Sequence, residues 1–197
     1  VAATFAVNSA GNAIAITAND LDLSGNVDSG ASATTIIDSD GTGISLGDAV
    51  VASGVNLTGA ELQNISATGL TASTAGSITV DNVTEANSNN VTGITTLVAA
   101  TEITFSGTAS TFNTLDARAD DRITVSVNIT TDSGELSLDG DADNAADTND
   151  DLQIAAGIQL SSAGLLTLDA ATGDIDGAGP LTLNAADGVT INDSLTT

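Results

Sequence analysis

The stretch that decides the fold reads Asp121-Arg122-Ile123-Thr124-Val125-Ser126-Val127-Asn128-Ile129-Thr130-Thr131. After an acidic turn, aliphatic residues alternate in it with short polar residues. Because successive side chains of a strand point to opposite faces, this alternation puts the aliphatic groups on one face and the hydroxyl groups on the other. The stretch therefore predicts a strand with one buried face and one solvated face.

The same phrase, two apolar residues separated by one polar residue, returns along the chain with Gly, Asn or Asp between its copies. It recurs at residues 44–46, 55–57, 78–80, 103–105, 136–138, 166–168, 181–183 and 189–191. Many short strands broken by turn residues are typical of an all-β repeat protein. We predict a right-handed parallel β-helix, or β-solenoid, of roughly 20–25 residues per coil, with residues 1–197 as a single repeat segment. One helical turn is expected at most, within residues 59–65.

Composition agrees with a thin core. Hydrophobic residues make up 41% of the 197 residues, but aromatic residues only 2%. A compact globule usually fills its centre with aromatic side chains, whereas a narrow solenoid has no deep centre to fill. We expect Ala, Val, Leu and Ile to form the core, together with Phe5, Phe105 and Phe112.

The charge of the chain excludes several partners. It carries 26 acidic and two basic residues, a formal net charge of −24, and no His. Phosphate groups are bound by Lys and Arg, so nucleic acid and anionic membrane surfaces are excluded as partners. No apolar run approaches the roughly 20 residues that cross a bilayer, so membrane insertion is not expected. Cations are expected to relieve the self-repulsion.

The chain contains no Cys, and a long stacked core does not need disulfides. This composition suits an extracellular surface protein, and we expect a secreted or cell-surface location. We also expect these residues to be a fragment of a longer exported protein.

Three stretches resemble the repeat regions of filamentous-haemagglutinin-like exoproteins, which use two-partner secretion. They are residues 121–131, residues 181–192 and Gly54-Val55-Asn56-Leu57-Thr58-Gly59-Ala60-Glu61-Leu62-Gln63-Asn64-Ile65. The resemblance implies a right-handed parallel β-helix, a role as a long surface filament or adhesin shaft, and no catalytic residues in the shaft.

An acidic loop is the strongest candidate site. It reads Asp139-Gly140-Asp141-Ala142-Asp143-Asn144-Ala145-Ala146-Asp147-Thr148-Asn149-Asp150-Asp151. Calcium binds six to eight oxygen atoms, and alternating Asp residues on a tight loop can supply them. Five carboxylates fall at positions 1, 3, 5, 9 and 12 of an EF-hand-like loop: Asp139, Asp141, Asp143, Asp147 and Asp150. The alternative is a solvated acidic insertion between coils.

Other polar clusters indicate turns or local pairing. Residues 38–43 could bind a cation, but the Asp-Gly that they contain is first of all a turn signal, as it is in residues 174–177. Arg118 and Arg122 stand among Asp residues and are expected to pair with them locally. Six Asn-x-Ser/Thr triplets could carry glycans or arise by chance: Asn56, Asn64, Asn82, Asn90, Asn128 and Asn192. The chain has no Lys, His, Tyr or Trp to act as a base or to stack a sugar. Acid/base catalysis by paired carboxylates remains possible, but their abundance singles out no pair, so we do not expect an enzyme.

Three functional hypotheses remain open. The first is a shaft segment of an extracellular β-helical filament or adhesin, whose partners are neighbouring repeats or copies of itself. The second is an adhesive module that binds surface glycans or matrix. The third is an acidic surface-layer-type coat protein built from tandem β-sandwiches. Strand direction separates the third from the first, because sandwiches of that kind are antiparallel.

Overall fold

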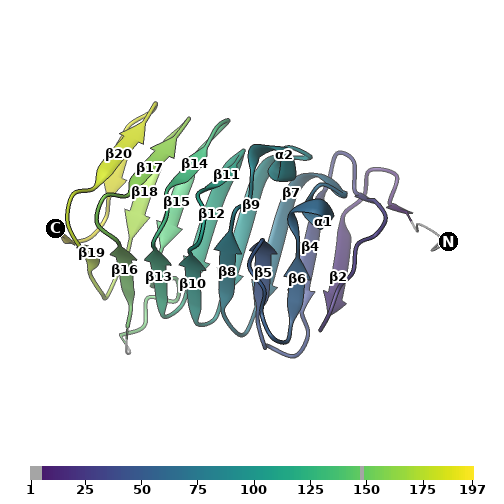
Figure 1. The fold of residues 1–197 in the computed structure, drawn as a ribbon, viewed down its shortest axis with the longest axis horizontal. Helices are drawn as coiled ribbons and strands as arrows, with labels where there is room; N and C mark the ends of the chain where they lie inside the picture. Colours follow the sequence, from purple (N-terminus) through teal and green to yellow (C-terminus); the bar gives the residue numbers. More distant parts are fainter. Residues whose placement is uncertain (1–5, 147–148) are drawn as a thin grey trace.

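The structure, a computed structural model, describes residues 6–146 and 149–197. The chain winds into a rod of stacked coils, with the first and last described coils at opposite ends (Figure 1). Over the described residues the strands form three sheets that run along the rod, and neighbouring strands in them are parallel. The predicted all-β parallel β-helix is thereby confirmed, and the tandem antiparallel sandwiches of the third hypothesis do not match it.

The largest sheet has the order β1-β3-β7-β9-β12-β15-β18-β21, with β2 and β4 beside it. β7 is long because its first residues pair with β3 and its later residues pair with β4. The bounds are β1 (Val7–Asn8), β2 (Ile14–Ala18), β3 (Val27–Asp28), β4 (Ala33–Asp38), β7 (Ile65–Thr74), β9 (Val91–Ala99), β12 (Thr114–Ala119), β15 (Leu136–Asp139), β18 (Leu166–Asp169) and β21 (Val189–Ile191).

The second sheet has the order β22-β19-β16-β13-β10-β8-β5-β6, and the third has the order β11-β14-β17-β20. The second contains β5 (Ile44–Gly47), β6 (Val55–Leu57), β8 (Ile78–Asp81), β10 (Glu102–Phe105), β13 (Arg122–Val125), β16 (Asp151–Ile154), β19 (Ile175–Gly177) and β22 (Leu195–Thr196). The third contains β11 (Ser110–Phe112), β14 (Ile129–Thr131), β17 (Gln159–Ser162) and β20 (Thr182–Ala185).

Two short helices within the described residues, α1 (Gly59–Leu62) and α2 (Glu85–Ser88), take the place of the third sheet in the earlier coils (Figure 1). The amide of Asn87 donates to the carbonyl oxygen of Gly59 at 3.0 Å, and the Ser88 hydroxyl donates to that of Thr111 at 3.0 Å. The helices and β11 therefore form one continuous stack.

Each helix begins at a capping box, in which a Thr side chain and the residue three positions later exchange hydrogen bonds. Thr58 pairs in this way with Glu61, and Thr84 with Asn87. The expected helical turn within residues 59–65 is confirmed by α1. The second turn was not expected, because its capping box uses Asn in place of Glu or Gln.

The core consists of aliphatic columns that run along the rod. One column joins Ile44, Ile78, Ile103, Ile123, Leu152 and Ile175, which are partners in adjacent strands and have no exposed surface. Fully burying a side chain of this size contributes about 1.5–3 kcal/mol. Phe105 and Phe112 also lie in the core, as expected, and Phe5 lies outside the described residues.

Coil length follows from the strand pairing. Ile78 pairs with Ile103 and Ile103 with Ile123, which are coils of 25 and 20 residues within the expected range. Two coils are longer: Ile44 pairs with Ile78 after 34 residues, and Ile123 pairs with Leu152 after 29. In the first of these coils, β6 is an additional strand that pairs in parallel with β5. In the second, the extra residues form the acidic loop.

Candidate functional site

The acidic loop connects β15 to β16, where the chain turns from the largest sheet to the second sheet. In the coil before it, the same turn is made by Asp120 and Asp121, and in the coil after it by residues 170–174. The three turns are stacked, since Arg118, Asp139 and Asp169 are partners in adjacent strands. We call residues 118–122, 139–146, 149–151 and 169–174 the acidic corner.

Two carboxylates of the loop turn inward and attach it to the following coil. Asp141 is 0% exposed and Asp150 is 5% exposed. Oδ2 of Asp141 accepts a hydrogen bond from the backbone N–H of Thr172 at 2.6 Å, and Oδ2 of Asp150 accepts one from the Thr172 hydroxyl at 3.1 Å. The other oxygen of Asp141, Oδ1, is buried and has no hydrogen-bond partner.

The other predicted ligands are arranged differently. Oδ1 of Asp139 accepts from the backbone N–H of Asp141 at 3.2 Å. Asp143 is exposed, and its Oδ1 accepts from Ala145 N at 2.9 Å, so it shapes a turn. Asn144 has the left-handed backbone conformation, with φ of 55°, which Asn adopts more readily than most residues.

Asp147, the remaining predicted ligand, lies outside the described residues. Within residues 6–146 and 149–197 no group of three or more carboxylates is arranged to hold a metal ion. The EF-hand-like set of five ligands therefore stays a prediction, and what the structure brings together is the inward pair, Asp141 and Asp150, at Thr172.

Like charges accumulate at this corner. Burial raises the pKa of Asp120, and the charges of Asp143, Asp121 and Asp141 raise it further. Burial also raises the pKa of Asp139, and the nearby charges of Asp169 and Asp141 raise it further. The hydrogen bond from the backbone N–H of Asp141 acts in the opposite direction and lowers this pKa. A carboxyl group whose pKa is raised on folding destabilises the folded state when ionised, so the corner gains stability as the pH falls towards the ordinary carboxyl value. A cation bound at the corner would also stabilise the folded state, because its charge offsets that of the carboxylates.

Asp120 and Thr172 were not predicted as parts of the site. Each lies one coil away from the loop, and the number of residues in a coil varies. Only the strand pairing of β12, β15 and β18 shows that the three turns coincide.

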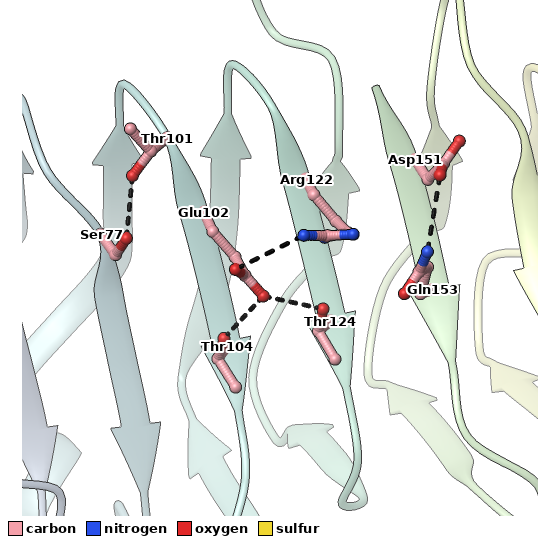
Figure 2. Close-up of polar contacts among 8 residues, drawn as sticks. All are labelled: Ser77, Thr101, Glu102, Thr104, Arg122, Thr124, Asp151 and Gln153. Carbon is pink, nitrogen blue, oxygen red and sulfur yellow. Dashed lines mark hydrogen bonds and ion pairs between the residues drawn. The ribbon is translucent and has the colours of Figure 1, made fainter. Parts of the chain in front are cut away.

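The outward face of the second sheet carries polar contacts within and between coils, and Figure 2 shows those from Ser77, next to β8, to Gln153 on β16. Oε1 of Glu102 accepts hydrogen bonds from the hydroxyls of Thr104 and Thr124, at 3.1 and 3.0 Å. Nη2 of Arg122 lies 3.8 Å from Oε2 of Glu102. These contacts link β10 to β13 on the outward face of the second sheet.

The expected local pairing holds for Arg118, which pairs with Asp116, but was wrong for Arg122, which pairs with Glu102 of the preceding coil because β10 and β13 are adjacent. Arg118 makes the shorter ion pair, with 2.6 Å between its Nη2 and Oδ2 of Asp116. The hydrogen bond with Asp116 and the charge of that residue raise the pKa of Arg118.

Beside these contacts the second sheet has a shallow hollow of about 360 Å³. Its polar lining includes Thr124, Gln153 and Asp176, which are partners in β13, β16 and β19.

Asp38 confirms the interpretation of residues 38–43 as a turn. Its Oδ2 accepts from the backbone N–H of Gly43 at 2.9 Å and from the hydroxyl of Thr74 at 2.8 Å, and the side chain is 5% exposed. Burial acts to raise the pKa of Asp38, but the hydrogen bonds from Gly43, Thr74 and Asp40 outweigh it and hold the pKa below its ordinary value.

Replacing Asp38 with Ala is expected to lower the free energy of unfolding by about 2–4 kcal/mol at pH 7, because Gly43 N–H and the Thr74 hydroxyl lose their acceptor. A carboxyl group with a lowered folded pKa contributes its full stabilisation above the ordinary value and loses it as the pH falls through the folded pKa. Urea unfolding from pH 7 to pH 2 should show the difference from the wild type shrinking. The exposed Asp187, replaced with Ala, is the control, and an Asp38 effect that is constant with pH would contradict the assignment.

The amide nitrogens of most Asn-x-Ser/Thr triplets already donate to other groups. Those of Asn64 and Asn90 donate to the carbonyl oxygens of Leu23 and Gln63, both at 2.6 Å. The amides of Asn56, Asn82 and Asn192 donate as well. A glycan on one of these nitrogens would replace a donor hydrogen, so the structure gives these Asn residues a role in joining turns and coils.

The fold and the acidic corner define this chain as a parallel β-helix with a charged insertion at one turn. Comparison with protein-family models, with curated proteins and with solved structures found no match in any of the three. Among the helices that the structure describes, none is long and apolar enough to span a bilayer.

Proposed function

We propose that the chain is a shaft segment of a long extracellular or cell-surface β-helical filament or adhesin, of the filamentous-haemagglutinin-like kind. The observation that carries the proposal is the continuity of the columns. Aliphatic residues stack on aliphatic residues from β5 to β19. Such a rod needs no ligand to perform its role, which is to hold another part of the protein away from the cell.

The last described coil continues the aliphatic columns of the rod. Val189 and Ile191 extend the columns of Leu166 and Leu168, which are fully buried. Val189 and Ile191 are 42% and 39% exposed.

The acidic surface suits the same role. A net charge of −24 keeps neighbouring shafts apart at low salt, and divalent cations would reduce the repulsion between coils and between shafts. We propose that cations, calcium among them, serve the shaft in this way.

Immunogold electron microscopy of the native filament tests the shaft proposal against the binding module. Antibodies raised to this segment are expected to label the filament between the cell and its tip. Labelling confined to the tip would contradict the shaft and favour an adhesive module.

The binding module has one specific observation in its favour, the hollow lined by Thr124, Gln153 and Asp176. Hydroxyl, amide and carboxylate groups on adjacent coils could bind a glycan chain that runs along the rod. Binding of the purified segment to a glycan array, lost when Gln153 is replaced with Ala, would support this second function. No such binding is expected from a shaft.

A further inference from the structure

We propose that the acidic corner binds one divalent cation of the calcium type at Oδ1 of Asp141, with Asp150 and backbone carbonyl oxygens of the described loop residues as further ligands. The inference deepens the role of cations in the proposed shaft, and it concerns the inward pair of carboxylates.

The first argument is the cost of an unpartnered buried carboxylate. Asp141 is 0% exposed, and its Oδ1 has no hydrogen-bond donor. Burying an ionised carboxylate without compensation is strongly unfavourable, so such groups are paired, bound to metal or protonated. The surroundings increase this cost, because Asp120, Asp139 and Asp143 add further negative charge at the same corner.

The second argument is that the chain has no spare cationic side chain to compensate Asp141. Its two basic residues are Arg118 and Arg122, and it has no His. Within the described residues Arg118 forms its ion pair with Asp116 and Arg122 forms its ion pair with Glu102. A positive partner for Asp141 therefore has to come from the solvent.

The third argument concerns the kind of ion. Thr172 brings three loop residues together. Its backbone N–H donates a hydrogen bond to Asp141 and its hydroxyl donates one to Asp150. The same hydroxyl lies 3.4 Å from the carbonyl oxygen of Ala145. Calcium accepts carboxylate, carbonyl and water oxygens in irregular geometry, whereas magnesium requires a near-ideal octahedron. Since no three carboxylates converge among the described residues, we expect a modest affinity, with a Kd of roughly 10⁻⁴–10⁻³ M.

Thermal unfolding of the chelator-treated chain, at constant ionic strength, tests the inference with calcium and magnesium as probes. At calcium tenfold above Kd, the wild-type Tm is expected to rise by roughly 3–6 °C, and magnesium should have a smaller effect. Asp141→Asn should lose the calcium response. Its Tm without calcium should equal or exceed that of the wild type, because the amide still accepts from Thr172 N–H and the buried charge is gone.

Asp187→Asn removes the same charge from an exposed position and should keep the full calcium response. Asp150→Asn is the second variant, in case Asp141→Asn does not fold, and it should weaken the response. An equal response in Asp141→Asn and Asp187→Asn, or no response in the wild type, would overturn the proposal. Failure of this site leaves the immunogold result unaffected, so the two proposals can fail separately.

Discussion

Replacing Phe105 with Ala is expected to lower the free energy of unfolding by about 3–5 kcal/mol, since a buried aromatic side chain is lost and the cavity cannot fully close. Phe105 has no exposed surface, and its partners in the adjacent coils are Val80 and Val125. The ring is the largest side chain of its column, and a solenoid coil contacts only its two neighbours, which limits repacking. Urea unfolding followed by circular dichroism would measure the loss.

The matched control is Ile94→Ala on β9, because Ile94 is 43% exposed. We expect this variant to lose less than about 1 kcal/mol, as surface substitutions usually do. Hydrogen exchange should place the Phe105→Ala effect in β8, β10 and β13. A loss as small as that of Ile94→Ala would contradict the assigned packing.

Gly47→Ala is the second substitution with a large expected effect, about 3–5 kcal/mol, because it combines backbone strain with a collision. Gly47 ends β5 with φ of 79°, a left-handed conformation that favours Gly, and an added Cβ would collide with the carbonyl oxygen of Asp81 in the next coil. The coil stack would have to open at β5 and β8 to accept the methyl group. The midpoint of thermal or urea unfolding would report the loss.

Gly157 separates the two causes. Its φ is 80°, nearly that of Gly47, but nothing lies within 4 Å of the position that a Cβ would take. Gly157→Ala should therefore show the conformational cost alone, about 1–2 kcal/mol. Equal losses in the two variants would mean that the close approach of β5 and β8 does not matter for stability.

The strands could be predicted because the chain repeats one local rule. Each apolar-polar-apolar phrase, from residues 44–46 to 189–191, lies in a strand or overlaps one. The alternation determines which side chains face inward, and β-branched residues favour the strand conformation. The stack of α1 and α2 was only half predicted, because a four-residue helix is specified by its capping residues and by its neighbours above and below.

The candidate site was predicted less completely. The density of Asp residues showed where charge gathers, but residue spacing cannot tell which carboxylates turn inward. The structure buries Asp141 and Asp150 and leaves Asp143 exposed. The cause is Thr172 in the following coil, which donates to both inward carboxylates.

The sequence by itself determined the strand content, the thin aliphatic core, the parallel coil and the strongly acidic surface, because these follow from the alternation of residues and from composition. Only the tertiary structure decided the pairing between coils of unequal length, and with it which distant residues meet. Backbone hydrogen bonds between coils align Arg118, Asp139 and Asp169, whatever the length of the loops between them. That alignment stacks like charges at one corner and leaves a buried carboxylate oxygen there.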